Sequence, residues 1–107
     1  MSHTDLQVFL TDTAALGRAT TLFRENGLRA FLLHLNAGEQ LPEHRTPGAI
    51  AVQCLRGEAT FSTAEESVTL KPASLISVAP GLAHSVVALQ DTLFLITVSE
   101  QFRAQAE

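Results

Sequence analysis

The chain has 107 residues, a length that suits one compact domain and is too short for two domains of ordinary size. No apolar run approaches the roughly 20 residues of a membrane helix, so we expect no membrane association. The net charge is −4 and the arginines are scattered along the chain, which argues against nucleic-acid binding because phosphate binding needs clustered cations.

The N-terminal stretch MSHTDLQVFLTDT lacks the basic region and apolar core of a secretory signal. Together with a single cysteine, Cys54, this predicts a cytoplasmic protein. Residues 11–16 are the helical candidate in this region, because Thr11 or Asp12 can cap a turn that contains two alanines.

From residue 18 onward, apolar and polar side chains alternate, and turn residues recur every eight to twelve positions. Asn26-Gly27 separates the predicted strands 18–24 and 28–35 and predicts a tight hairpin, because both residues tolerate positive φ. Further strands are expected at residues 49–55, 58–63, 67–70, 75–78, 84–89 and 92–98, and residues 99–107 are expected to be a surface tail.

Eight or nine short strands without alternating helices predict an all-β fold, either a closed barrel or a double-sheet jelly roll. Closure would also protect the sheet edges, which a small all-β protein must do in some way.

Two short motifs make the family resemblance specific. Gly38, His44, Thr46, Ile50 and Gly57 have the spacing of the first cupin motif, which reads Gly, five residues, His-x-His, three or four residues, Glu, six residues, Gly. The stretch APGLAH, residues 79–84, is similar to the second motif, Pro-x-Gly-x-x-His, with alanine in place of the proline. The sequence is identified as a small cupin of the RmlC-like superfamily over residues 28–98, in one domain spanning 1–107.

The resemblance implies a cupin-type double-stranded jelly-roll β-barrel, often homodimeric, with a pocket between its sheets. Family enzymes bind iron, manganese, nickel, copper or zinc through the two histidines and the glutamate of the first motif and the histidine of the second. In this chain Thr46 replaces the second histidine and Ile50 replaces the glutamate. Only His44 and His84 remain as ligands for a divalent transition metal such as Fe, Mn, Ni or Zn, so we expect the usual metal site to be lost.

Side chains two positions apart in a strand point to the same face, so the pocket face is expected to carry six ligand-binding residues. They are His44, Thr46, Ile50, Val52, Cys54 and His84. Cys54 is either a soft ligand or thiol nucleophile in the pocket or, as is commoner for free cysteine, a small buried hydrophobe.

Residues 75–77 are candidates for a wall of the same pocket. His34 is expected on the opposite sheet face, and Arg45 is either solvated or placed over the pocket mouth.

Two functions from different classes fit these residues. The first is a module that binds a small molecule without a metal or other cofactor, since two of the four ligands are lost. The second is an enzyme that uses His44 and His84, either as a metal-dependent oxygenase or isomerase or as a metal-free epimerase-like catalyst. A histidine base needs a partner acid, yet the chain has no tyrosine and Ile50 removes the expected carboxylate.

Overall fold

The computed structural model describes residues 1–13 and 16–100. Within this part of the chain, one short helix, α1 (Gln7–Thr11), precedes a series of nine strands. The strands are β1 (Ala19–Glu25), β2 (Leu28–Leu35), β3 (Gln40–His44), β4 (Ile50–Arg56), β5 (Ala59–Ser62), β6 (Ser67–Leu70), β7 (Leu75–Val78), β8 (His84–Ala88) and β9 (Thr92–Ser99). The predicted all-β class is confirmed, and β3 is a further strand inside the first motif.

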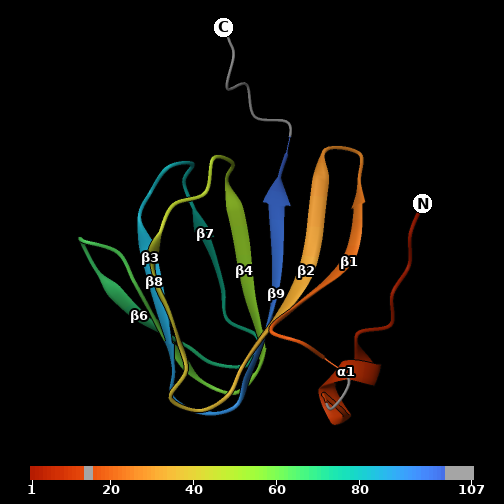
Figure 1. The fold of residues 1–107 in the computed structure, drawn as a ribbon, viewed down its shortest axis with the longest axis horizontal. Coiled ribbons are helices and arrows are strands. Elements are labelled where there is room, and N and C mark those ends of the chain that lie inside the picture. The colour runs from red at the N-terminus through yellow and green to blue at the C-terminus, as the bar shows by residue number, and fades with distance from the viewer. Residues whose placement is uncertain (14–15, 101–107) are drawn as a thin grey trace, which may run out of the picture.

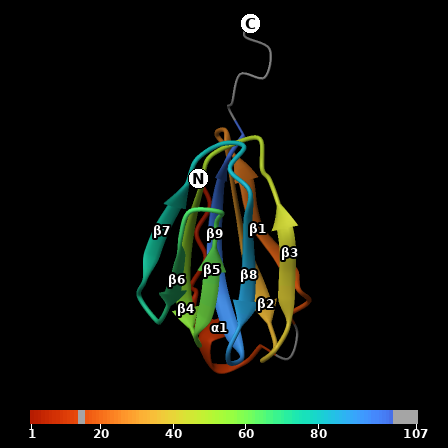
Figure 2. The ribbon, with the colours of Figure 1, turned by 90° about the vertical axis from the view of Figure 1, so that its left-hand side faces the viewer.

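The strands form two antiparallel sheets that face each other (Figure 1). The five-stranded sheet has the order β1-β2-β9-β4-β7 and the four-stranded sheet has the order β3-β8-β5-β6. Figure 2 views the molecule from the side of the four-stranded sheet. Since sequence neighbours such as β3 and β4 lie in different sheets, the chain passes back and forth between the layers, as in a jelly roll.

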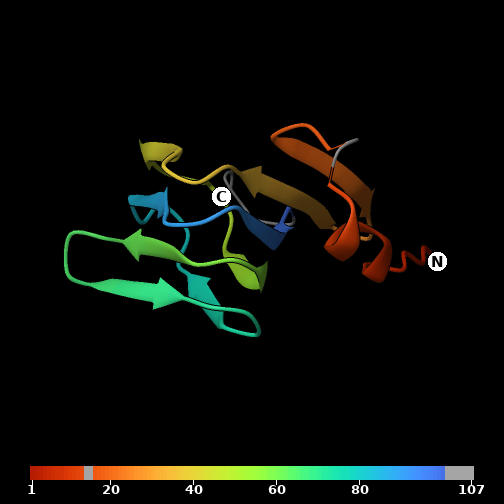
Figure 3. The ribbon, with the colours of Figure 1, turned by 90° about the horizontal axis from the view of Figure 1, so that it is seen from below.

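The predicted Asn26-Gly27 hairpin is present between β1 and β2. Both residues have positive φ, at 56° for Asn26 and 76° for Gly27. This is the backbone of a type I′ turn, whose twist matches that of the strands it joins. The hairpin projects beyond the four-stranded sheet on the side of α1 (Figure 3).

The hydrophobic core lies between the sheets and follows from alternation along each strand. In β4, Ile50, Val52 and Cys54 point inward and are at most 6% exposed, while their neighbours Ala51 and Gln53 are only half-buried. Phe94 of β9 is 1% exposed within the same cluster. The alternation therefore places the apolar side chains of the strand together on the core face.

The N-terminal segment lies against the other face of the five-stranded sheet. The Arg56 guanidinium donates a hydrogen bond to the Leu10 carbonyl at 3.0 Å, near the end of α1. It also forms an ion pair with Asp91, whose other carboxylate oxygen lies 3.0 Å from His34 Nε2. These contacts connect α1 to the end of the sheet, and they place His34 on the face away from the core, as predicted.

Of the two predicted forms, the double-sheet jelly roll is the one present, and the two sheets do not close into a barrel. Within residues 1–13 and 16–100, β1 and β7 are edges of one sheet and β3 and β6 are edges of the other. Short length and irregularity protect these edges in place of closure: β6 and β7 have four residues each, and β3 contains a proline.

The predictions at the two ends of the chain were less successful. The helix spans Gln7–Thr11 and overlaps the predicted segment 11–16 only at Thr11; residues 14 and 15 lie outside the described part. Ser99, predicted to begin the tail, is the last residue of β9, and Glu100 pairs with Arg24 at 2.8 Å. Residues 101–107 lie outside the described part.

Gly57 occupies a place where the chain makes a close approach. Its φ is +91°, and a Cβ added there would lie 2.2 Å from the Asp91 carbonyl oxygen. A side chain would therefore require both a left-handed backbone conformation and a shift of the turn before β9. Gly38 has a similar φ, +87°, but a Cβ there would have no neighbour within 4 Å.

The pair Gly57→Ala and Gly38→Ala separates these two effects. Gly38→Ala should lower the free energy of unfolding by about 1–2 kcal/mol, the cost of positive φ for a residue with a Cβ. Gly57→Ala should lower it by at least about 1 kcal/mol more, because the backbone must also move. Urea denaturation of both variants measures the difference, and equal losses would contradict the close approach at Gly57.

Candidate functional site

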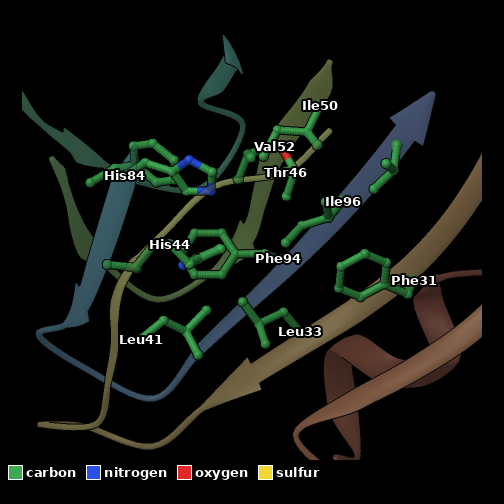
Figure 4. A pocket seen from close by; sticks show the side chains of 13 residues that line it. Phe31, Leu33, Leu41, His44, Thr46, Ile50, Val52, His84, Phe94 and Ile96 are labelled. Atoms are coloured by element: carbon green, nitrogen blue, oxygen red, sulfur yellow. The ribbon is translucent and has the colours of Figure 1, made fainter. Parts of the chain in front are cut away.

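A cavity of about 90 Å³ lies between the inner faces of the two sheets. Most of its wall is apolar, and three polar side chains lie at one end: His44, Thr46 and His84. Figure 4 shows Phe31 at the far end from His84. The lining residues are Phe31, Leu33, Leu41, His44, Thr46, Ile50, Val52, Phe61, His84, Val86, Phe94, Ile96 and Val98.

A bulge in β3 brings His44 opposite His84. The pairing of β3 with β8 runs Gln40 to Val87 and Leu41 to Val86, and then shifts so that His44 pairs with His84. Continued regular pairing would instead have placed Glu43 opposite His84. Since side chains alternate along a strand, the extra residue also puts Leu41 and His44 on one face although they are three positions apart.

The two histidine rings are in contact and have the same hydrogen-bonding arrangement. Their centroids are 4.3 Å apart with an interplanar angle of 65°, an edge-to-face geometry. His44 Nδ1 lies 3.0 Å from the Pro42 carbonyl oxygen and His84 Nδ1 lies 2.8 Å from that of Leu82. A carbonyl oxygen only accepts, so Nδ1 carries the proton in each ring, and in the neutral form Nε2 has a free lone pair.

His84 is the buried member of the pair, at 2% exposure, whereas His44 is exposed at the cavity mouth. Phe61 stacks on the His84 ring with a centroid distance of 5.4 Å and an interplanar angle of 12°. Burial lowers the pKa of His84; the hydrogen bond to Leu82 opposes this, and His44 adds a smaller lowering. His84 is therefore a neutral imidazole at pH 7.

The loops that carry the two motifs are held together by backbone groups. The Gly81 N–H donates to the Thr46 carbonyl at 2.8 Å, and the Arg45 guanidinium donates to the Gly81 carbonyl at 2.7 Å. The Thr46 hydroxyl donates to the Gly48 carbonyl at 3.1 Å. Arg45 thus spans the two loops, and Thr46 is fixed beside the cavity.

The structure brings five of the six expected ligand-binding residues together around the cavity: His44, Thr46, Ile50, Val52 and His84. Cys54 is not among the lining residues. It is completely buried in the core, and its Sγ lies 3.5 Å from the Arg56 carbonyl oxygen. Burial raises the pKa of the Cys54 thiol, which disfavours the thiolate that a nucleophile or metal ligand requires.

The expected wall at residues 75–77 does not line this cavity. Ile76 lines a separate opening, which lies beside Phe61 and Leu82. The reason is the position of β7 at the sheet edge, beyond β4, while the cavity lies over β2, β9 and β4.

Sequence reasoning missed much of the apolar wall. Phe31 and Leu33 of β2 and Ile96 and Val98 of β9 line the cavity through the alternation of their strands. That alternation was a usable signal, but it gives no information on which strands face one another. Leu41 had no such signal, because its place depends on the bulge.

The donors around the cavity do not fit the four-ligand metal centre of the resembled family. At the glutamate position, Ile50 has no donor atom, and Thr46 offers a neutral hydroxyl that already contacts Gly48. Within the described part of the chain, no group of three or more His, Cys, Asp or Glu side chains is placed to hold a metal ion.

Comparison with solved structures places the fold among the cupins. A cupin-superfamily protein from Desulfitobacterium hafniense has a TM-score of 0.72 at 18% identity, over 76% of this chain and 74% of that one. An RmlC-like cupin from Methanocaldococcus jannaschii, described as a double-stranded β-helix, has a TM-score of 0.71 at 14% identity, over 83% and 87%. A Thermus thermophilus protein has a TM-score of 0.76 at 21% identity, over 94% and 98%.

No protein-family model matches the sequence, and no curated protein matches it significantly. These structural matches are below 25% identity, so they establish the fold and not an activity. The chain has the double-stranded β-helix fold of the cupins. No helix within the described residues is long and apolar enough to cross a membrane.

Burial of His84 predicts a pH dependence of stability. Because the pKa of His84 is lowered on folding, the unfolded chain binds more protons below its own pKa of about 6.5. The free energy of unfolding should therefore fall as the pH drops from about 6.5 through the folded-state pKa. In His84→Gln this part of the slope should disappear, whatever the absolute stability of the variant.

Denaturant titrations at several pH values measure that slope. His3→Gln is the matched control, since His3 is exposed near the N-terminus, and it should retain the slope of the parent. A parental slope in His84→Gln would show that His84 does not cause the dependence.

Proposed function

We propose that the protein is a small-molecule-binding cupin whose pocket works without a metal. The observation that supports this most is the cavity itself, which is apolar except for His44, Thr46 and His84 at one end. An apolar enclosure with a few convergent polar groups is the usual form of a site for a small organic molecule.

The size of the cavity limits the ligand. Its volume of about 90 Å³ is well below the roughly 300–1,000 Å³ of a typical ligand pocket. By proportion to a cavity of about 150 Å³ that holds benzene, the enclosed part has room for about three or four carbon atoms. His44 is exposed at the mouth, so a polar head can extend toward solvent while the apolar part is buried.

The metal-independent part of the proposal is based on the chemistry of the donors. Two imidazoles leave a divalent ion to complete its coordination with water, next to the apolar side chain of Ile50. This surrounding disfavours a bare cation. The expected homodimer and the cytoplasmic location remain predictions alongside this one.

An enzyme that uses His44 and His84 is the second candidate, favoured by one observation. The two rings are 4.3 Å apart at the same end of the cavity, so one could give and the other take a proton. Among the described residues, the lining offers no carboxylate or tyrosine to share that task. We therefore place binding first, and turnover of a bound molecule is the result that would reverse the order.

Metal content tests the absence of a metal centre. Untagged protein incubated with iron, manganese, nickel and zinc and then desalted should contain well under one equivalent of metal by elemental analysis. The His44→Ala, His84→Ala double variant should give the same value. Stoichiometric metal that is present in the parent and absent from the double variant would contradict the proposal.

Filling the cavity tests whether it is the binding site. Ile96 lines the cavity, whereas Leu95 lies on the opposite face of β9, beside the N-terminal segment. Ile96→Phe should abolish the rise in melting temperature produced by small molecules found in a thermal-shift screen, and Leu95→Phe should retain it. Both variants should lose about 1–3 kcal/mol of stability from overpacking. Retained binding in a folded Ile96→Phe would place the site elsewhere.

A further inference from the structure

The three polar side chains of the cavity share a feature that bears on the chemistry of the ligand. Each one donates its own proton to a backbone carbonyl: His44 to Pro42, His84 to Leu82 and Thr46 to Gly48. The donors are therefore used within the protein. What each neutral group has left for a ligand is a lone pair, on Nε2 of the two imidazoles and on Oγ1 of the threonine.

His84 Nε2 is available to the cavity and not enclosed by protein. No side-chain nitrogen or oxygen in the described residues is both buried and without a partner. The described contacts of His84 involve its Nδ1 and the faces and edges of its ring, and none engages Nε2. Nε2 therefore reaches the accessible surface of the cavity that His84 lines.

Among residues 1–13 and 16–100, no Asp, Glu, Lys or Arg side chain lines the cavity. A carboxylate ligand would bring only acceptor oxygens to the lone pairs of the two imidazoles and the threonine. The neighbouring Arg45 guanidinium already donates to the Gly81 carbonyl. An ammonium would find acceptors but no counter-ion in an apolar surrounding. Both charged forms would lose hydration without adequate compensation.

We propose that the ligand is a small uncharged molecule whose head donates hydrogen bonds, such as a primary amide or an alcohol, on a short apolar tail. This inference rests on the proposed binding function and specifies its chemical class. The tail occupies the apolar end of the cavity near Phe31, and the head donates to His84 Nε2, beside His44. A head with a second N–H, such as a primary amide, also donates to Thr46 Oγ1.

A set of four-carbon ligands tests the head. Butyramide, butyrate and butylamine are titrated into the protein at about pH 8, where free imidazoles are neutral, and followed into the millimolar range by NMR of the cavity methyl groups and the histidine nitrogens. Butyramide should bind at least tenfold more tightly than butyrate or butylammonium, and it should move the Nε2 resonances of the histidines. Equal or tighter binding of either charged molecule would overturn the inference.

Xenon separates this inference from the proposed function, because it enters apolar cavities and has no head. Xenon shifts at the methyl groups of Ile50 and Ile96, together with preference for butyrate, would keep a binding cavity and reject the donor head. If neither xenon nor any of the three molecules moved those methyl groups, the proposed function would fall together with this inference.

Thr46→Val provides a second test, since valine keeps the shape of threonine and removes one acceptor. It should weaken butyramide binding by roughly threefold to tenfold, the usual effect of one neutral hydrogen bond, and leave the xenon shifts unchanged. Thr60→Val is the matched control: Thr60 neighbours Phe61 in β5, on the opposite face of the strand, and does not line the cavity. Equal butyramide affinities in parent and Thr46→Val would remove Thr46 from the head site.

Discussion

The one-residue bulge in β3 determines the character of the cavity. Regular pairing with β8 would carry Glu43 to the position opposite His84, and the pocket would then have a carboxylate beside a buried imidazole. With the bulge, His44 takes that position and Glu43 is exposed. The bulge contains Pro42, which has no N–H to offer a ladder and is tolerated because β3 is an edge strand. The same Pro42 presents its carbonyl to His44 Nδ1, so one local irregularity both aims the ring and sets its tautomer.

Much of the fold could be predicted from the sequence because it follows from local signals. Alternation located the strands, Asn26-Gly27 set the first hairpin, and the motif spacing identified the jelly roll. Closure into a barrel could not be predicted, since it depends on whether β7 and β6 meet across the sandwich, and neither four-residue strand carries a pairing signal. The helix was misplaced because its N-cap residue is Leu6, which has no capping side chain, while the Gln7 N–H donates to Asp5 one residue earlier.

The sequence could predict which residues face the cavity where the alternation along one strand is enough. It could not predict those whose place depends on contacts between distant parts of the chain. Ile50 and Val52 followed from the alternation of β4, and His44 and His84 from the motifs. Cys54 has the same parity, yet it lies beyond the end of the cavity, in the core near Gly57. Parity gives the face of a sheet but not the extent of a cavity along the strand.

In the metal-free pocket that we propose, the source of binding energy differs from that of a metal centre. A metal centre attracts its ligands through charge, whereas this cavity offers burial of a few carbons and hydrogen bonds to neutral acceptors. Three buried methylene groups contribute about 0.8 kcal/mol each, and two neutral hydrogen bonds about 1 kcal/mol each. The gross total is about 4 kcal/mol, and the freedom lost on binding reduces it, so a Kd of about 1 mM is the tightest expected. Under the proposed function, selectivity must come mainly from the head group, because a tail of three or four carbons distinguishes few molecules.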